Sequence, residues 1–123
     1  MRNWNQWMIR TAGVLLFAGV LSAGEKGLMH CFYFTPVATA TQTEWQAFFN
    51  ATDALPGKVP GLTRVWYGKL RSTVQERQYG VCMLMDGPEA LKTYAGHPAH
   101  KQWEEAYVKV RVYGTTTFDI LGQ

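Results

Sequence analysis

The stretch LKTYAGHPAHKQW, Leu91–Trp103, carries the signals that decide how this chain folds. Its apolar residues before Gly96 have the spacing of one helical face, and glycine is a common helix end. Pro98 suits the first turn of a further helix, and a proline keeps the residue before it out of the α region. The stretch therefore predicts two helices that meet at His97.

The rest of the sequence places strand and helix patterns around this junction. The capping-box pair Thr41 and Glu44 begins a first helix that is expected to end at the PGKVPG turns, residues 56–61. Pro88 suits the first turn of the helix that precedes His97. Runs of β-branched and aromatic residues predict four strands, at residues 28–34, 62–70, 78–85 and 111–121.

This order of elements, β-α-β-β-α-α-β, predicts an α+β domain with the ferredoxin-like split βαβ plan. The four strands are expected to form one antiparallel sheet with the helices on one face. Apolar side chains reach both faces, because Tyr33, Val65 or Trp66, and Met83 or Leu84 all lie in strands. A sheet that is apolar on both faces needs a second cover. A second copy of the chain, packed sheet against sheet, supplies it.

Three motifs make the chain resemble one known family. They are MHCFYF at 29–34, LPGKVPGL at 55–62, and the spacing L-x-x-Y-x-x-H-P-x-H that starts at Leu91. On these motifs the chain is similar to the stress-responsive dimeric α/β-barrel (Dabb) domain, from about Leu28 to Leu121. The resemblance implies a homodimer whose two sheets close into a barrel. It also implies a pocket between each sheet and its own helices.

The resemblance further implies candidate catalytic residues. The family includes a plant cyclase that folds a linear polyketide into an aromatic acid without a cofactor. Its catalytic histidine and tyrosine match His100 and Tyr94, and an early strand histidine of its site matches His30. Many members share this pattern without an assigned reaction, so the pattern leaves open whether the chain is an enzyme.

The residues themselves indicate an inward-facing cluster. His100 shares a helical face with Trp103 and Tyr107, and His30 alternates with phenylalanines in the first strand. Tyr94 faces inward from the preceding helix. Two interpretations stay open: a pocket for proton transfer, or three polar rings hydrogen-bonded within a core.

Aromatic side chains along the helices predict an apolar lining for such a pocket. The residues expected to hold a small apolar ligand are Trp45, Phe49, Trp103 and Tyr107. A neutral imidazole accepts a proton near pH 7, and a tyrosine hydroxyl donates to an oxygen on which charge develops. Proton transfer next to a carbonyl needs no cofactor, and none is expected.

Residues 1–24 have the composition of a leader. Two arginines and no acid precede an apolar run of 14 residues that closes in small residues, which is the order of a secretory signal peptide. The run is shorter than the ~20 residues that span a bilayer, so no stable membrane span is expected after processing. Cleavage after Ala23 would leave residues 24–123, and cleavage after Gly24 would leave residues 25–123. Residues 25–123 are the expected Dabb domain of a periplasmic or secreted protein. An uncleaved anchor or a misassigned start is the alternative.

Other classes of site have weaker signals. His97 and His100 have H-x-x-H spacing and His30 would be a third ligand, yet no carboxylate is evident beside them, so no metal site is expected. His97 is instead expected to be a junction residue whose ring bonds to nearby backbone. Without the leader, 10 of the 12 basic residues remain against 9 acidic ones. No basic stripe alternates with aromatics, so no nucleic-acid partner is expected.

The chain has two cysteines, Cys31 and Cys82. In the split βαβ plan their strands are neighbours in the sheet. A disulfide needs Cα atoms roughly 4.4–6.8 Å apart and side chains turned toward each other, and adjacent parallel strands seldom offer that geometry. Two free thiols are therefore expected, although export would permit oxidation.

Together these patterns predict an exported, dimeric, ferredoxin-like barrel with a small apolar pocket. The preferred function is binding of a small hydrophobic molecule. The alternative is a cofactor-independent cyclase, lyase or isomerase that uses a histidine–tyrosine acid/base pair. The shape of the cavity distinguishes the two functions. An open channel that contains His100 and Tyr94 favours chemistry, whereas a filled core favours a binding or structural role.

Overall fold

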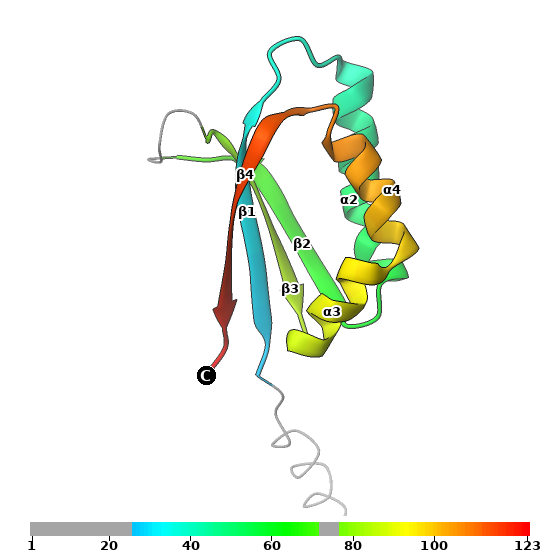
Figure 1. Ribbon diagram of the computed structural model, residues 1–123, viewed down its shortest axis with the longest axis vertical. Coiled ribbons are helices and arrows are strands. Elements are labelled where there is room, and N and C mark those ends of the chain that lie inside the picture. The colour runs from blue at the N-terminus through cyan, green and yellow to red at the C-terminus, as the bar shows by residue number, and fades with distance from the viewer. Residues whose placement is uncertain (1–25, 72–76) are drawn as a thin grey trace, which may run out of the picture.

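The computed structural model describes residues 26–71 and 77–123, and the expected signal peptide at residues 1–24 lies outside them. The described chain forms one sheet with its helices on one face (Figure 1). None of the described helices is long and apolar enough to cross a membrane. The elements in chain order are β1 (Leu28–Pro36), α2 (Gln42–Lys58), β2 (Leu62–Lys69), β3 (Tyr79–Met85), α3 (Pro88–Gly96), α4 (Pro98–Tyr107) and β4 (Arg111–Leu121).

The strands lie in the order β2-β3-β1-β4, and every neighbouring pair is antiparallel. β1 is therefore an inner strand, with β3 on one side and β4 on the other. The order and the directions are those of the split βαβ plan. The predicted α+β, ferredoxin-like fold with a four-stranded antiparallel sheet is confirmed.

Helix α2 begins with the predicted capping box. The Glu44 backbone N–H donates to the Thr41 hydroxyl at 3.1 Å, and the Thr41 N–H donates to the Glu44 carboxylate at 3.0 Å. The helix ends within the PGKVPG segment as expected, although Pro56 still belongs to its last turn. The Val59 N–H bonds to the Leu55 carbonyl oxygen at 2.9 Å and closes the helix.

The junction at His97 connects α3 to α4. His97 has an extended backbone (φ −80°, ψ 141°), and its N–H bonds to the Tyr94 carbonyl oxygen at 3.1 Å where α3 ends. Its ring Nδ1 accepts a hydrogen bond from the Ala99 N–H at 3.0 Å and so caps α4. The prediction that the His97 ring bonds to nearby backbone at a helix junction is confirmed.

The core lies between the sheet and the helices and is rich in aromatic side chains. Phe34 of β1 and Phe48 of α2 are buried, with ring centroids 6.0 Å apart in an edge-to-face arrangement. The Tyr107 ring of α4 packs on both, at 5.0 and 5.8 Å. A buried hydroxyl links two helices, because Thr52 accepts from Trp103 Nε1 at 2.9 Å. The core thus holds α4 firmly against α2 and the sheet.

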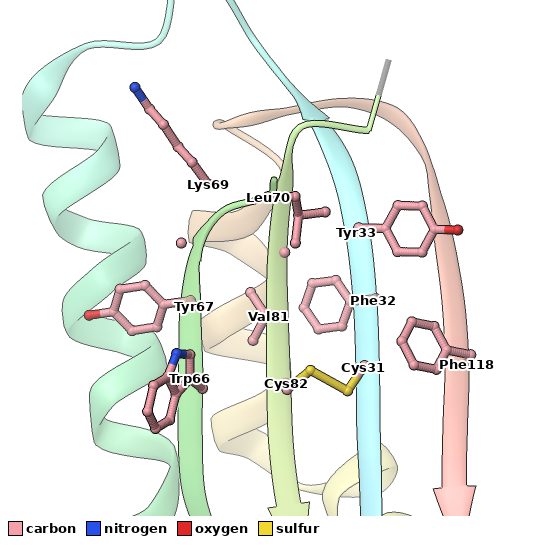
Figure 2. Close-up of a pocket in the computed structure, with 12 residues that line it drawn as sticks. Cys31, Phe32, Tyr33, Trp66, Tyr67, Lys69, Leu70, Val81, Cys82 and Phe118 are labelled. Carbon is pink, nitrogen blue, oxygen red and sulfur yellow. A yellow bond between two sulfur atoms is a disulfide. The ribbon is translucent and has the colours of Figure 1, made fainter. Parts of the chain in front are cut away.

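Cys31 and Cys82 form a disulfide, so the prediction of two free thiols is wrong. Their placement on neighbouring strands is confirmed, but the prediction took those strands as parallel. β1 and β3 are antiparallel, and Cys31 lies directly opposite Cys82 with a Cα–Cα distance of 4.1 Å. Opposite residues of an antiparallel pair turn their side chains to the same face. Figure 2 shows the disulfide on the face that no helix covers.

The helix-free face of the sheet is apolar, as predicted. Trp66 and Leu84 lie on this face, whereas their alternatives Val65 and Met83 pack in the core. Trp66 is 65% exposed and Phe118 of β4 is 45% exposed, which is unusual for large apolar side chains that lie on one surface.

A hollow of about 230 Å³ lies on this face beside the disulfide (Figure 2). Gly68 of β2 is opposite Gly80 of β3 in the register, two residues along from the pair Trp66 and Cys82. Neither glycine has a side chain to fill the space beside the disulfide. Leu70 covers one end, because its Cδ2 atom lies 3.0 Å from the position that a Cβ of Gly80 would take.

Candidate functional site

A separate cavity of about 200 Å³ lies on the helix-covered face, between β1 and β4 on one side and α3 and α4 on the other. It opens to solvent. Its lining includes His30, Tyr94, His100, Trp103, Tyr107 and Arg111. The structure therefore brings together the three predicted catalytic residues and two of the four residues predicted to bind a ligand.

Tyr94 and His100 are in contact in this cavity, with ring centroids 4.4 Å apart. Tyr94 is only 4% exposed. Burial raises the pKa of the Tyr94 hydroxyl above its usual value, and the negative charge of Glu104 adds to the effect. The hydroxyl therefore stays protonated at neutral pH and is available as a donor. The His100 ring has no hydrogen bond to any described residue.

His30 and Asp119 form a second polar pair on the sheet side of the cavity. The two residues are opposite each other in the β1–β4 register, and His30 Nδ1 lies 2.6 Å from Asp119 Oδ1. Because an ionised carboxylate only accepts, this bond keeps the proton on Nδ1 and leaves Nε2 of the neutral ring as an acceptor. The His30 and Tyr94 ring centroids are 6.1 Å apart. A histidine that a carboxylate orients in this way has the arrangement of a general base.

Trp103 and Tyr107 form the apolar wall of the cavity. They lie one turn apart on α4, and their rings stack at 4.7 Å. Trp103 Nε1 donates to the Thr52 hydroxyl at 2.9 Å. The Tyr107 and Thr115 hydroxyls share a hydrogen bond of 2.7 Å. Because the polar atoms of both rings are satisfied by the protein, the wall offers mainly apolar surface to a ligand.

The other two residues predicted to bind a ligand, Trp45 and Phe49, do not line this cavity. Trp45 packs on Phe34 and Tyr79, with ring centroids 6.4 and 5.0 Å apart. Phe49 stacks on Tyr67 at 5.2 Å. Both belong to α2, which packs against β2, whereas the cavity lies near β4 at the opposite edge of the sheet. These two rings complete the core.

Sequence reasoning missed three charged residues of the site: Asp119, Arg111 and Glu104, which lines the cavity from α4. Asp119 had a signal, because it is the one acid in the run TTTFDIL and the antiparallel pairing of β4 with β1 places it opposite His30. Arg111 had none. It is the first residue of β4, and its place at the cavity depends on how the chain turns from α4 into the sheet.

The described residues contain no group of three or more His, Cys, Asp and Glu side chains that could hold a metal ion. The Nδ1 atom of His97 is engaged in capping α4, and His97 does not line the cavity. The two histidines of the H-x-x-H spacing thus lie at different places: His97 caps α4, and His100 lines the cavity.

Residues 28–121 match the family model of the stress responsive A/B barrel domain, Dabb. The chain belongs to this family. The match extends from the first residue of β1 to the last residue of β4, and it confirms the family that the three sequence motifs indicated. Among curated proteins, none is significantly similar in sequence to this Dabb domain.

Solved structures share the fold of this Dabb domain at low sequence identity. A dimeric ferredoxin-like protein of unknown function from Jannaschia sp. CCS1 is 24% identical, with a TM-score of 0.65 over 76% of this chain and 97% of its own. A hydroxynitrile lyase from Passiflora edulis is 10% identical, with a TM-score of 0.65 over 80% and 95%. A cofactor-independent oxygenase from Streptomyces nogalater is 17% identical, with a TM-score of 0.55 over 80% and 92%. At these identities the likeness establishes the fold alone.

The cavity of this Dabb domain has the parts that acid–base chemistry needs. Tyr94 supplies a protonated hydroxyl, and His30 supplies an oriented imidazole. His100 supplies an imidazole that has ring contacts but no hydrogen bond among the described residues. The wall beside them is apolar. With a volume of about 200 Å³, the cavity is smaller than the roughly 300–1,000 Å³ pockets that hold drug-sized ligands, so it has room only for a small molecule.

Proposed function

We propose that this Dabb domain binds a small, largely apolar carbonyl compound in this cavity and transfers a proton at the carbon next to the carbonyl, without a cofactor. The observation that carries the proposal is the contact between Tyr94 and His100, with ring centroids 4.4 Å apart, inside a cavity that opens to solvent. A filled core at this place would instead favour a structural role.

In the proposed reaction, His30 is the base. Its Nε2 takes the proton from the carbon, and the Asp119 carboxylate stabilises the imidazolium that forms. The electron pair of the broken C–H bond moves into an enolate, whose oxygen accepts a hydrogen bond from the Tyr94 hydroxyl. The His30 imidazolium then returns a proton to the same carbon, or to another carbon conjugated with the enolate, and so becomes neutral again; exchange of its proton with solvent beforehand puts a solvent proton on the product. The net reaction is proton exchange or isomerisation.

The other candidate function is ligand binding without chemistry. In either case, the surroundings of His100 argue against a cluster that is purely structural. Polar rings that are buried in a core have hydrogen-bond partners. The His100 ring is half-buried at an open cavity, and among the described residues it has ring contacts with Tyr94 and Trp103 but no hydrogen bond. Such a ring is available to a ligand.

The test is solvent exchange. Phenylacetone is incubated with the protein in deuterated buffer, and the loss of its α-proton signals is followed by NMR. Tyr94→Phe removes one hydroxyl and keeps the ring, so it should lower the exchange rate by about 10²-fold. Tyr113→Phe is the matched control, because Tyr113 is 93% exposed, and it should exchange at the wild-type rate.

An equal rate for wild type and Tyr94→Phe would contradict the catalytic role of the hydroxyl. Binding of phenylacetone with no exchange beyond that in buffer would show a site that binds without chemistry.

We also propose that the protein is a homodimer through the helix-free face of the sheet. Large apolar side chains, among them Trp66 and Phe118, are exposed on that face. The similar protein from Jannaschia is dimeric. Burial of this face against a second copy would remove apolar surface from water, which is the main driving force of stable association.

Finally, we propose that the protein is exported and processed after Ala23 or Gly24. The leader pattern of residues 1–24 supports this, and so does the Cys31–Cys82 disulfide, because disulfides persist in oxidising compartments. Mass spectrometry of protein from the periplasm or medium should show the shortened chain with two hydrogens fewer than the dithiol form. A full-length chain in the cytoplasm would contradict export.

A further inference from the structure

Among the described residues that line the cavity, Arg111 has a buried side-chain nitrogen, Nε, without a hydrogen-bond partner. Buried N–H groups in native proteins are almost always paired with protein or with a bound molecule. Since Arg111 also lines the cavity, a ligand in the cavity is in reach of its guanidinium.

The guanidinium packs on a buried aromatic ring. Its Cζ atom lies 4.8 Å from the ring centroid of Tyr107. Tyr107 is itself fixed by the hydrogen bond of its hydroxyl to Thr115. Stacking uses the flat face of the guanidinium and leaves the N–H groups at its edge free to donate. An arginine fixed in this way loses little further freedom when it binds an anion.

The charged groups near Arg111 leave its charge uncompensated. Asp119 is bonded to His30 at 2.6 Å. Glu104 of α4 also lines the cavity, but it is exposed and forms no ion pair with Arg111. The other nearby arginine, Arg77, already donates to the hydroxyls of Thr35 and Thr116. Within residues 26–71 and 77–123, Arg111 is therefore a cationic group of the cavity that has no ion-pair partner.

We propose that the ligand of this cavity carries a carboxylate and that Arg111 binds it. The inference rests on the proposed function in that it concerns the same cavity, and it narrows the substrate class to small carboxylic acids with an apolar body. The planar fork of arginine donors matches the two oxygens of a carboxylate. The apolar body would lie against the wall of Trp103 and Tyr107, near the hydroxyl of Tyr94.

The experiment compares benzoate with benzamide, which has the same shape and no charge, by calorimetric titration of the purified protein. Benzoate should bind about tenfold or more tightly, as for a hydrogen bond to a charged group. Arg111→Met should remove this preference and leave benzamide binding unchanged, which also shows that the variant is folded. Arg111→Lys should restore part of it, because lysine keeps the charge without the fork. Lys101→Met, the same loss of charge at an exposed position of α4 outside the cavity, should behave as wild type.

Equal binding of benzoate and benzamide by the wild type would overturn the inference, and so would an Arg111→Met variant that keeps the preference or weakens both ligands alike. Failure of both probes to bind would overturn it as well. The proposed function is tested separately, by the proton exchange of phenylacetone, which carries no charge and so does not depend on carboxylate binding. A carboxylate preference that depends on Arg111, without any exchange, would indicate a carboxylate-binding site that has no chemistry.

Discussion

At the scale of single residues, His30 and Asp119 form the proposed base of the cavity, with His30 Nδ1 2.6 Å from Asp119 Oδ1. Asp119→Asn should lower proton exchange by tenfold or more, because an amide no longer stabilises the imidazolium of His30. The free energy of unfolding should change by less than about 1 kcal/mol, because the carboxylate is 39% exposed and exposed pairs contribute little. Exchange kinetics and urea melts measure the two effects.

Glu89→Gln is the control for that substitution. Glu89 is an exposed acid of α3 that pairs with Lys92 at 3.4 Å, so the change in charge is the same and the cavity is untouched. If both variants slow exchange equally, the effect is one of net charge, and Asp119 has no special role.

The residues of the site differ in how well the sequence reveals them. His30, Tyr94 and His100 follow from the periodicity of their own strand or helix, which is a local property. Asp119 and Arg111 become part of the site only through the pairing of β4 with β1 and the turn after α4, which join residues far apart in sequence. Periodicity alone cannot provide that information.

At the scale of elements, the hydroxyl of Thr52 links α2 to α4. Thr52→Val keeps the shape but leaves Trp103 Nε1 buried without its acceptor. The free energy of unfolding should fall by about 1–3 kcal/mol. Thr43→Val, at an exposed position of the same helix, should cost much less, and a similar loss for both would show that helix propensity rather than the hydrogen bond is responsible. Chemical denaturation of the two variants gives the comparison.

The ends of the helices were predictable because they depend on neighbouring residues. The Thr41–Glu44 box and the cap at His97 both form as their local patterns indicate. The disulfide was mispredicted, because its formation depends on strand direction. Once β1 and β3 are antiparallel, the register places Cys31 opposite Cys82, with both side chains on the same face of the sheet.

At the scale of the whole molecule, tyrosines whose pKa values are raised by burial should make the protein less stable at alkaline pH. Burial raises the pKa of Tyr67 to about 12, and it raises the pKa values of Tyr79, Tyr94 and Tyr107. In the unfolded chain these groups ionise near pH 10, so above that pH the unfolded state binds fewer protons. The free energy of unfolding should therefore be constant up to about pH 9 and fall between about pH 10 and 12.

Urea melts across this range measure the decline, and Tyr94→Phe should make it shallower. A stability that rises with pH above about 10 would have the wrong sign for buried, neutral tyrosines.

The proposed dimer depends on the helix-free face as a whole. Trp66→Glu places a charge at its most exposed tryptophan, and it should convert a dimer of 13.9 kDa chains, or of the shorter processed chains, into monomers. Light scattering at micromolar concentration measures the mass. Val108→Glu, an exposed apolar position at the end of α4, should remain dimeric. A wild-type protein that is already monomeric would contradict the proposal.

The central claim is that small molecules bind in the cavity beneath the helices. Histidine side-chain NMR with phenylacetone tests it most directly, because His30 and His100 line that cavity and His97 does not. We expect the ligand to shift the imidazole signals of His30 and His100 and to leave those of His97 in place. The claim would be contradicted if the signals of His30 and His100 did not move and the ligand shifted only signals of the helix-free face, such as that of the Trp66 indole.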